Sequence, residues 1–265
     1  MANPRRDNRV AECDRLPATG GVWVTGASSG IGRALCTRLV AEGRWVAGSA
    51  RSQDTLFSLR DELGEHFYPV PVDTTSMIDL NVAITNLERS VGPINLAVLN
   101  AGIYEPEGDD GFDGEAARQI IKVNVLGTIN CLTAVLPRMR QRGVGQIALM
   151  ASVAGYRGLP HAAAYGASRA AVLSLAESLK FELEPAGIAV QVITPGFVET
   201  QLTAKNTFPM PFIITPDSAA RRIVSGLRSD SFEITFPRRF TYMMKLLRLL
   251  PYRLYFPLVR RIIGD

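Results

Sequence analysis

The chain has 265 residues, 47% of them hydrophobic, and carries 29 Lys and Arg against 25 Asp and Glu. A chain of this length and apolar content can bury one large core, and α/β domains of this size are commonly single. Its three cysteines and two histidines are too few and too scattered for a disulfide framework or a metal site, so we expect neither of these, and a reducing, cytoplasmic compartment.

Residues 1–19 make up a polar segment that contains Arg5, Arg6 and Arg9. The segment lacks the apolar stretch of a signal peptide, so we expect a flexible N-terminal tail. Further along the chain there is no run of about 20 uninterrupted apolar residues. No membrane-spanning helix is therefore expected.

Apolar, strand-like runs alternate with helical stretches along the rest of the chain. The runs cover residues 21–25, 45–50, 68–72, 95–100, 146–151 and 188–194. This alternation is typical of βαβ units that close a parallel sheet. The pattern predicts an α/β fold with a parallel sheet flanked by helices.

The first apolar run leads into a glycine-rich turn, and a helical pattern follows the turn. The turn reads Gly26-Ala27-Ser28-Ser29-Gly30-Ile31-Gly32, a spacing that departs from the commoner dinucleotide fingerprint. Backbone without Cβ lets a pyrophosphate approach, and the start of the helix presents free N–H groups and a positive dipole to it. We interpret the turn as a candidate pyrophosphate site, with a purely structural turn as the alternative.

The second apolar run ends in Ala50 and Arg51. In a dinucleotide site an acidic side chain here would bind both ribose hydroxyls of NAD and would repel a 2′-phosphate. A guanidinium can instead make a charge-assisted contact to phosphate. The sequence therefore favours NADP(H), with a solvated Arg51 as the alternative.

A tyrosine is followed four residues later by an arginine in the run Tyr165-Gly166-Ala167-Ser168-Arg169. Residues i and i+4 lie on the same face of a helix. A phenol is a poor acid near neutral pH, and a fixed cation nearby favours its ionised form. The pair is a candidate proton-transfer device, although an isolated pair of this kind is more often a simple surface contact.

Other short motifs follow the predicted strands at regular places. They are Asn100-Ala101-Gly102, Asn124 between two valines, Ser152, and Pro195-Gly196. With these motifs the chain resembles the short-chain dehydrogenase/reductase family over about residues 20–230. The resemblance implies a single doubly wound Rossmann-type domain, residues 20–237, that binds a nicotinamide dinucleotide.

The resemblance also implies roles for individual residues. Asn124, Ser152, Tyr165 and Arg169 would form the reaction centre, Asp73 with Thr74 beside it would contact the adenine, and Val198 and Thr200 would hold the nicotinamide amide. The expected cofactor-binding residues are Gly26, Ser28, Ser29, Gly30, Ile31, Gly32, Arg51, Asp73, Thr74, Asn100, Ala101, Gly102, Tyr165, Arg169, Pro195, Gly196, Val198 and Thr200.

One position departs from the family pattern, because the family normally carries lysine where this chain has Arg169. Arginine can hold ribose hydroxyls and favour a tyrosinate, but it cannot release a proton into a relay. We expect an active NADP(H)-dependent enzyme that interconverts an apolar ketone or aldehyde and its alcohol, with Tyr165 as general acid and base. The alternative is a catalytically weak or inactive cofactor-sensing protein on the same fold.

Two later segments bear on partners. Phe208, Met210, Phe212 and Ile213, after the Pro-Gly motif, could line an apolar substrate pocket.

Residues 238–265 carry seven Lys and Arg against Asp265 alone, with apolar residues between them and Pro251 and Pro257 as interruptions. This extension predicts short helices at the inner face of a membrane or, equally, packed on the subunit or at a homo-oligomer interface, and its apolar content argues against nucleic acid.

Overall fold

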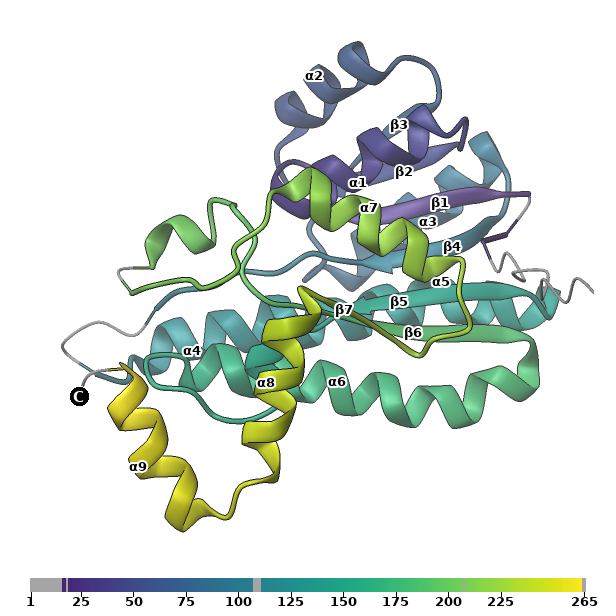
Figure 1. Ribbon diagram of the computed structural model, residues 1–265. Helices are drawn as coiled ribbons and strands as arrows, with labels where there is room; N and C mark the ends of the chain where they lie inside the picture. Colours follow the sequence, from purple (N-terminus) through teal and green to yellow (C-terminus); the bar gives the residue numbers. More distant parts are fainter. Residues whose placement is uncertain (1–15, 18, 107–110, 207, 264–265) are drawn as a thin grey trace, which may run out of the picture.

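The computed structural model describes residues 16–17, 19–106, 111–206 and 208–263, so most of the predicted tail over residues 1–19 lies outside the described residues. The described strands form one seven-stranded sheet in the order β3-β2-β1-β4-β5-β6-β7, and every neighbouring pair is parallel (Figure 1). The predicted α/β fold, a doubly wound Rossmann-type domain, is confirmed. The order reverses direction between β1 and β4, the switch point where such sheets bind ligands.

Each of the strands β1 to β6 lies within one residue of its predicted range. The strands are β1 (Gly21–Thr25), β2 (Val46–Ala50), β3 (Phe67–Pro71), β4 (Ile94–Leu99), β5 (Gly145–Met150), β6 (Ile188–Pro195) and β7 (Glu233–Phe236). The central strands β1, β4 and β5 are buried along their whole length because helices cover both faces. The sequence analysis missed β7, whose four residues alternate between buried and half-buried and give no apolar run.

Two helical layers enclose the sheet. The helices α1 (Gly30–Ala41), α2 (Gln53–Leu63) and α7 (Pro216–Leu227) contribute to one core cluster. The helices α3 (Met77–Val91), α5 (Gly127–Arg142) and α6 (Ala163–Leu183) contribute to the other (Figure 1).

Cys36 and Cys131 fill these two layers from α1 and α5, and burial raises the pKa of both thiols. Neither thiol is thus set up as a reactive thiolate.

The helix α4 (Gly114–Ile121) continues through a π-helical turn, Lys122–Leu126, into α5. By length and composition alone, this continuous helix over Gly114–Arg142 could cross a membrane, the one such helix in the described part of the chain. Core helices of soluble proteins meet the same criteria, and this one packs against α3 and α6. The finding gives only weak support for a membrane span.

The C-terminal extension forms α8 (Arg238–Leu249) and α9 (Tyr252–Ile263), drawn in yellow-green and yellow in Figure 1. Phe240 and Met244 of α8 enter the core of the domain. Pro251 separates the two helices as predicted, but the interruption predicted at Pro257 is wrong because α9 runs through it. Pro257 removes one backbone donor from an exposed part of the helix, where water can bond the freed carbonyl.

Candidate active site

The glycine-rich turn opens α1 without a side-chain cap. Ser29 is the N-cap residue, yet its hydroxyl accepts no amide hydrogen bond, and the first turn of α1 holds no acidic residue. The helices α2, α3, α4 and α7 are capped by a Ser, Asp or Thr side chain, whereas α6 and α8, like α1, begin without one. The free N–H groups of α1 therefore suit an anion such as a pyrophosphate.

Glycines are required in this turn for steric reasons. Gly26 and Gly30 have φ of 68° and 52°, a region that side chains rarely adopt. A Cβ on Gly32 would clash with the carbonyl oxygen of Gly26. Ser28, Ser29 and Gly30 line a groove of about 1120 Å³ together with Thr200.

Asn100 and Ala101 brace the turn from the end of β4. The Asn100 amide donates to the carbonyl oxygens of Thr25 (2.9 Å) and Gly26 (3.3 Å), and the Ala101 N–H donates to the Thr25 hydroxyl (2.9 Å). These bonds fasten β4 to the turn across the switch point of the sheet. The sequence analysis missed Thr25, which supplies two of the three acceptors.

Two arginines near the end of β2 have different surroundings. Arg33 of α1 forms an ion pair with Glu62 of α2, so its charge is already partnered. Arg51 is exposed, and no acidic residue in the described part of the chain pairs with it. Arg51 can thus offer a free guanidinium at the end of β2.

Asp73 and Thr74 form the turn after β3. The Asp73 carboxylate accepts the Thr75 N–H at 2.8 Å and so fixes its own turn. Thr74 is buried against α5, and a Cβ on Gly127 would lie 2.8 Å from its hydroxyl oxygen. The two residues close the β3 side of the site.

The segment after β6 closes the opposite side. The Gly196 N–H donates to Phe236 O at 2.7 Å, which ties the Pro195-Gly196 turn to β7. The Val198 side chain is buried in the core, so only its backbone could meet a ligand. A Cβ on Gly30 would lie 3.0 Å from the Thr200 methyl group, so this segment reaches the glycine-rich turn.

Tyr165 and Arg169 lie together on α6, as their spacing predicts. The guanidinium carbon is 5.1 Å from the centre of the tyrosine ring. Arg169 is 3% exposed, and its Nη1 donates to Met150 O at the end of β5 (2.8 Å). Its Nε is buried with no hydrogen-bond partner among the described residues. A Cβ on Gly102 would clash with Nη2 of this side chain, so the glycine makes room for it.

Ser152 follows β5 and caps a short 3₁₀ turn. Its hydroxyl accepts the Ala154 N–H (3.2 Å) and makes only a long contact to Pro195 O (3.5 Å). The hydroxyl hydrogen thus has no strong acceptor and can turn toward a ligand.

Asn124 supports α6 from within the π-helical turn. The side chain is fully buried, accepts the Ile103 N–H (2.7 Å), and donates to Ile103 O (2.9 Å) and to the Ser168 hydroxyl (3.0 Å). Ser168 in turn donates to Tyr165 O (2.7 Å). A chain of hydrogen bonds therefore runs from Asn124 to the backbone of Tyr165.

Sequence reasoning overlooked two neighbours of Tyr165. Ser168 is part of the Tyr165–Arg169 run, but a serine inside a helix carries no distinctive signal. Tyr104 is buried and meets the Tyr165 ring edge-on, with the ring centres 4.9 Å apart. Its place directly after the Asn100-Ala101-Gly102-Ile103 segment was the only available clue.

The predicted substrate segment divides between two places. Phe208 packs edge-on against Phe197, whereas Met210 and Ile213 line the large groove beside the glycine-rich turn. Phe212 is half exposed. Within the described ranges, no three His, Cys, Asp or Glu side chains are grouped so that they could hold a metal ion.

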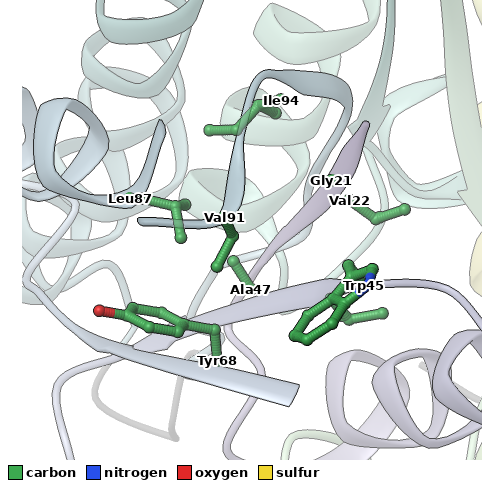
Figure 2. A pocket seen from close by; sticks show the side chains of 9 residues that line it. Gly21, Val22, Trp45, Ala47, Tyr68, Leu87, Val91 and Ile94 are labelled. Atoms are coloured by element: carbon green, nitrogen blue, oxygen red, sulfur yellow. The ribbon is translucent and has the colours of Figure 1, made fainter. Parts of the chain in front are cut away.

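A second cavity lies at the opposite end of the sheet. Figure 2 shows Trp45, Tyr68 and Val91 among the side chains around it, near the start of β1. Its volume is about 10 Å³ and its lining is almost wholly apolar, so it holds at most one water molecule. It is a packing gap and not part of the site.

Known proteins match this arrangement. A family model described as short chain dehydrogenase matches residues 21–209. An uncharacterized oxidoreductase of Myxococcus xanthus is 37% identical over 242 residues, which cover 90% of this chain and 96% of that protein. A 3-oxoacyl-[acyl-carrier-protein] reductase of Salmonella typhimurium is 32% identical over 68% of this chain and 74% of its own. A solved short-chain dehydrogenase from Streptomyces avermitilis covers 86% of this chain and 92% of its own with a TM-score of 0.75 and 25% identity.

Proposed function

The chain belongs to the short-chain dehydrogenase family of oxidoreductases, and from this premise we propose that it is an NADP(H)-dependent reductase of apolar ketones or aldehydes. The observation that carries the proposal is the buried guanidinium of Arg169 beside the ring of Tyr165. Burying a charge is costly unless it is paired or hydrogen-bonded, and here one donor has no partner among the described residues. Such arrangements cluster at functional sites.

The residues present fit a nicotinamide dinucleotide. The uncapped start of α1 and the glycines of the turn suit its pyrophosphate, and the free guanidinium of Arg51 suits a 2′-phosphate. The guanidinium of Arg169, beside Tyr165, carries further N–H donors that suit a ribose hydroxyl. This set supports NADP(H) over NAD(H).

When bound, the nicotinamide supplies the hydride for carbonyl reduction. The Tyr165 hydroxyl donates its proton to the substrate oxygen as that oxygen gains negative charge. The Ser152 hydroxyl donates a hydrogen bond to the same oxygen. Arg169, held by Met150 O, stabilises the tyrosinate that remains, and Asn124 fixes the position of α6 through Ser168.

For the substrate we propose an apolar ketone, aldehyde or the corresponding alcohol, because Met210 and Ile213 line the groove beside the glycine-rich turn and Phe208 packs against Phe197 nearby in the same segment. For the location we propose the cytoplasm, with the extension over residues 238–265 available to the inner face of a membrane or to a second subunit. Nucleic acid is not proposed as a partner.

A substrate screen tests the proposal. Purified protein with NADPH is given ketones and aldehydes of increasing chain length, and oxidation of NADPH is followed by absorbance. We expect turnover that improves with the apolar length of the substrate. Absence of turnover with every carbonyl, together with NADPH binding and turnover in Arg169→Lys, would instead establish the cofactor-sensing alternative.

A further inference from the structure

Large apolar side chains gather on the outside of the two C-terminal helices. They are Tyr242, Met243, Leu246, Leu249, Tyr252, Leu254, Phe256 and Leu258. Leu249 is 78% exposed and Tyr252 is 69% exposed. A surface normally shows such side chains singly, and a dense group of them on two successive helices indicates an interaction site.

Cations lie between these apolar side chains. The exposed arginines are Arg238, Arg239, Arg248, Arg253, Arg260 and Arg261. No acidic residue of the described chain pairs with any of the six, and residues 238–263 include no Asp or Glu. We refer to the eight apolar residues and the six arginines together as the outer face.

The inner side of both helices is anchored to the domain. Phe240 and Met244 of α8 are buried in the core, and Lys245 forms an ion pair with Glu233 of β7. On α9, Tyr255 and Val259 are buried. The outer face therefore cannot be covered by a simple rotation of these helices, since that would expose the buried side instead.

Arg157 joins both helices to the loop between Ser152 and Tyr165. Its guanidinium donates to Leu247 O (2.9 Å) and Leu250 O at the end of α8, and lies 3.9 Å from the centre of the Tyr255 ring. The Tyr255 hydroxyl donates to Gly158 O of the same loop. The extension is thus fastened to a loop that connects two residues of the reaction centre.

We propose that the outer face docks on an anionic lipid bilayer. Acyl chains accept leucine and phenylalanine side chains, headgroup phosphates pair with arginines, and tyrosines suit the boundary between the two. A second copy of the chain is a poor occupant, because a symmetric contact would bring the arginines of both copies into one interface, and residues 238–263 offer no carboxylate to pair with them. Docking places the Arg157 loop near the lipid, where an apolar substrate concentrates. Only this link to the substrate rests on the proposed function, and the docking itself does not.

Vesicle flotation with the full-length protein tests the docking. The probes are neutral phosphatidylcholine vesicles and vesicles with about one third phosphatidylglycerol, and no substrate or cofactor is added. We expect binding to the anionic vesicles that weakens as salt rises, with a salt-resistant remainder from the apolar side chains. Equal binding to both vesicle types, or binding to neither, would overturn the proposal.

Two double variants test the two components of the outer face. Arg253→Ala with Arg260→Ala should weaken anionic binding about 30-fold, since each basic residue near such a surface contributes about fivefold. Leu249→Ser with Leu254→Ser should remove most of the salt-resistant remainder. These side chains are exposed, so the variants should fold normally, which circular dichroism checks.

Matched controls change the same residue types elsewhere on the surface. Arg60→Ala with Arg89→Ala removes two exposed arginines from α2 and α3, and Ile78→Ser with Val82→Ser removes two exposed apolar side chains from α3. Both controls should bind like the unmodified protein. Equal losses in the controls, or loss of an oligomer in the outer-face variants without any vesicle binding, would contradict bilayer docking. A protein that reduces no carbonyl yet floats with anionic vesicles would refute the proposed function alone.

Discussion

The proposed reaction centre and the C-terminal extension depart from the ordinary surface and core in opposite ways. Around Tyr165 a charged guanidinium and a carboxamide are buried, Arg169 at 3% exposed and Asn124 at 0%. On α8 and α9, leucines are left in solvent, with Leu249 at 78%. Folding alone favours neither arrangement, because buried charge and exposed apolar surface both cost free energy.

The two regions also differ in how they are held. The reaction centre depends on hydrogen bonds between elements far apart in sequence, such as Asn124 with Ile103 and Ser168. The extension depends on apolar packing of its inner side and on the cluster around Glu233. The proposed reaction centre therefore requires accurate positions of its side chains, whereas the C-terminal extension requires only apolar and basic side chains on its outer face.

The largest expected effect is on turnover at the reaction centre. Tyr165→Phe keeps the ring and its packing but removes the transferable proton, so carbonyl reduction should fall at least about 100-fold. NADPH binding, measured by fluorescence titration, should change little. The control is Tyr242→Phe on the outer side of α8, which should reduce a soluble substrate at the unmodified rate. A Tyr165→Phe protein with full turnover would remove Tyr165 from the chemistry.

The next effect is on stability. Asn124→Ala leaves the partly buried N–H of Ile103 without its acceptor, so the free energy of unfolding should fall by about 1–3 kcal/mol. Urea unfolding followed by circular dichroism measures the loss. Asn81→Ala, at an exposed position of α3, should change stability by less than about 0.5 kcal/mol. Similar losses in both variants would show that burial of Asn124 has no special importance.

A smaller effect is expected on cofactor choice. The unmodified protein should bind NADP(H) at least about tenfold more tightly than NAD(H), or about 1.4 kcal/mol, because Arg51 can pair with the 2′-phosphate. Arg51→Ala should erase most of this preference in calorimetric titrations, while Arg60→Ala should keep it. Equal dissociation constants for both cofactors in the unmodified protein would contradict the prediction.

The smallest effect concerns the attachment of the extension. Burial acts to raise the pKa of the Glu233 carboxyl, but hydrogen bonds from Lys245, Tyr156 and Thr194 outweigh it and lower that pKa. Because the folded pKa lies below the unfolded value of about 4.3, the stabilisation is present above that pH and is lost as the pH falls through the folded pKa.

Glu233→Gln tests this attachment. The variant should be less stable than the unmodified protein at pH 7 by about 1 kcal/mol or less, and the difference should shrink as the pH falls below about 4. Thermal unfolding across this pH range measures the difference. Glu182→Gln breaks an exposed pair with Arg140 and should show a smaller change at pH 7. A difference that persists at low pH would contradict the role of the Glu233 charge.

The sequence predicted the strands of the sheet well and β7 not at all. The central strands β1, β4 and β5 carry apolar runs because helices cover both of their faces. The edge strand β7 is four residues long and is buried at only two of them, so its pattern resembles a loop. At Pro257 the sequence predicted an interruption that the structure does not have. The position is on an exposed side of α9, where water can bond the carbonyl that the proline leaves without a donor.

The sequence by itself determined the fold class, the glycine-rich turn and the i, i+4 pairing of Tyr165 with Arg169, because each depends on a short stretch of chain with a fixed periodicity. The tertiary structure alone decided that Asn124 reaches α6 through Ser168, that Tyr104 meets Tyr165, and that Arg157 fastens the extension to the active-site loop. These contacts join residues far apart in the chain, such as Arg157 and Leu250, which are 93 positions apart. The packing of the helices on the sheet determines which of these residues are in contact, and no local pattern in the sequence encodes that packing.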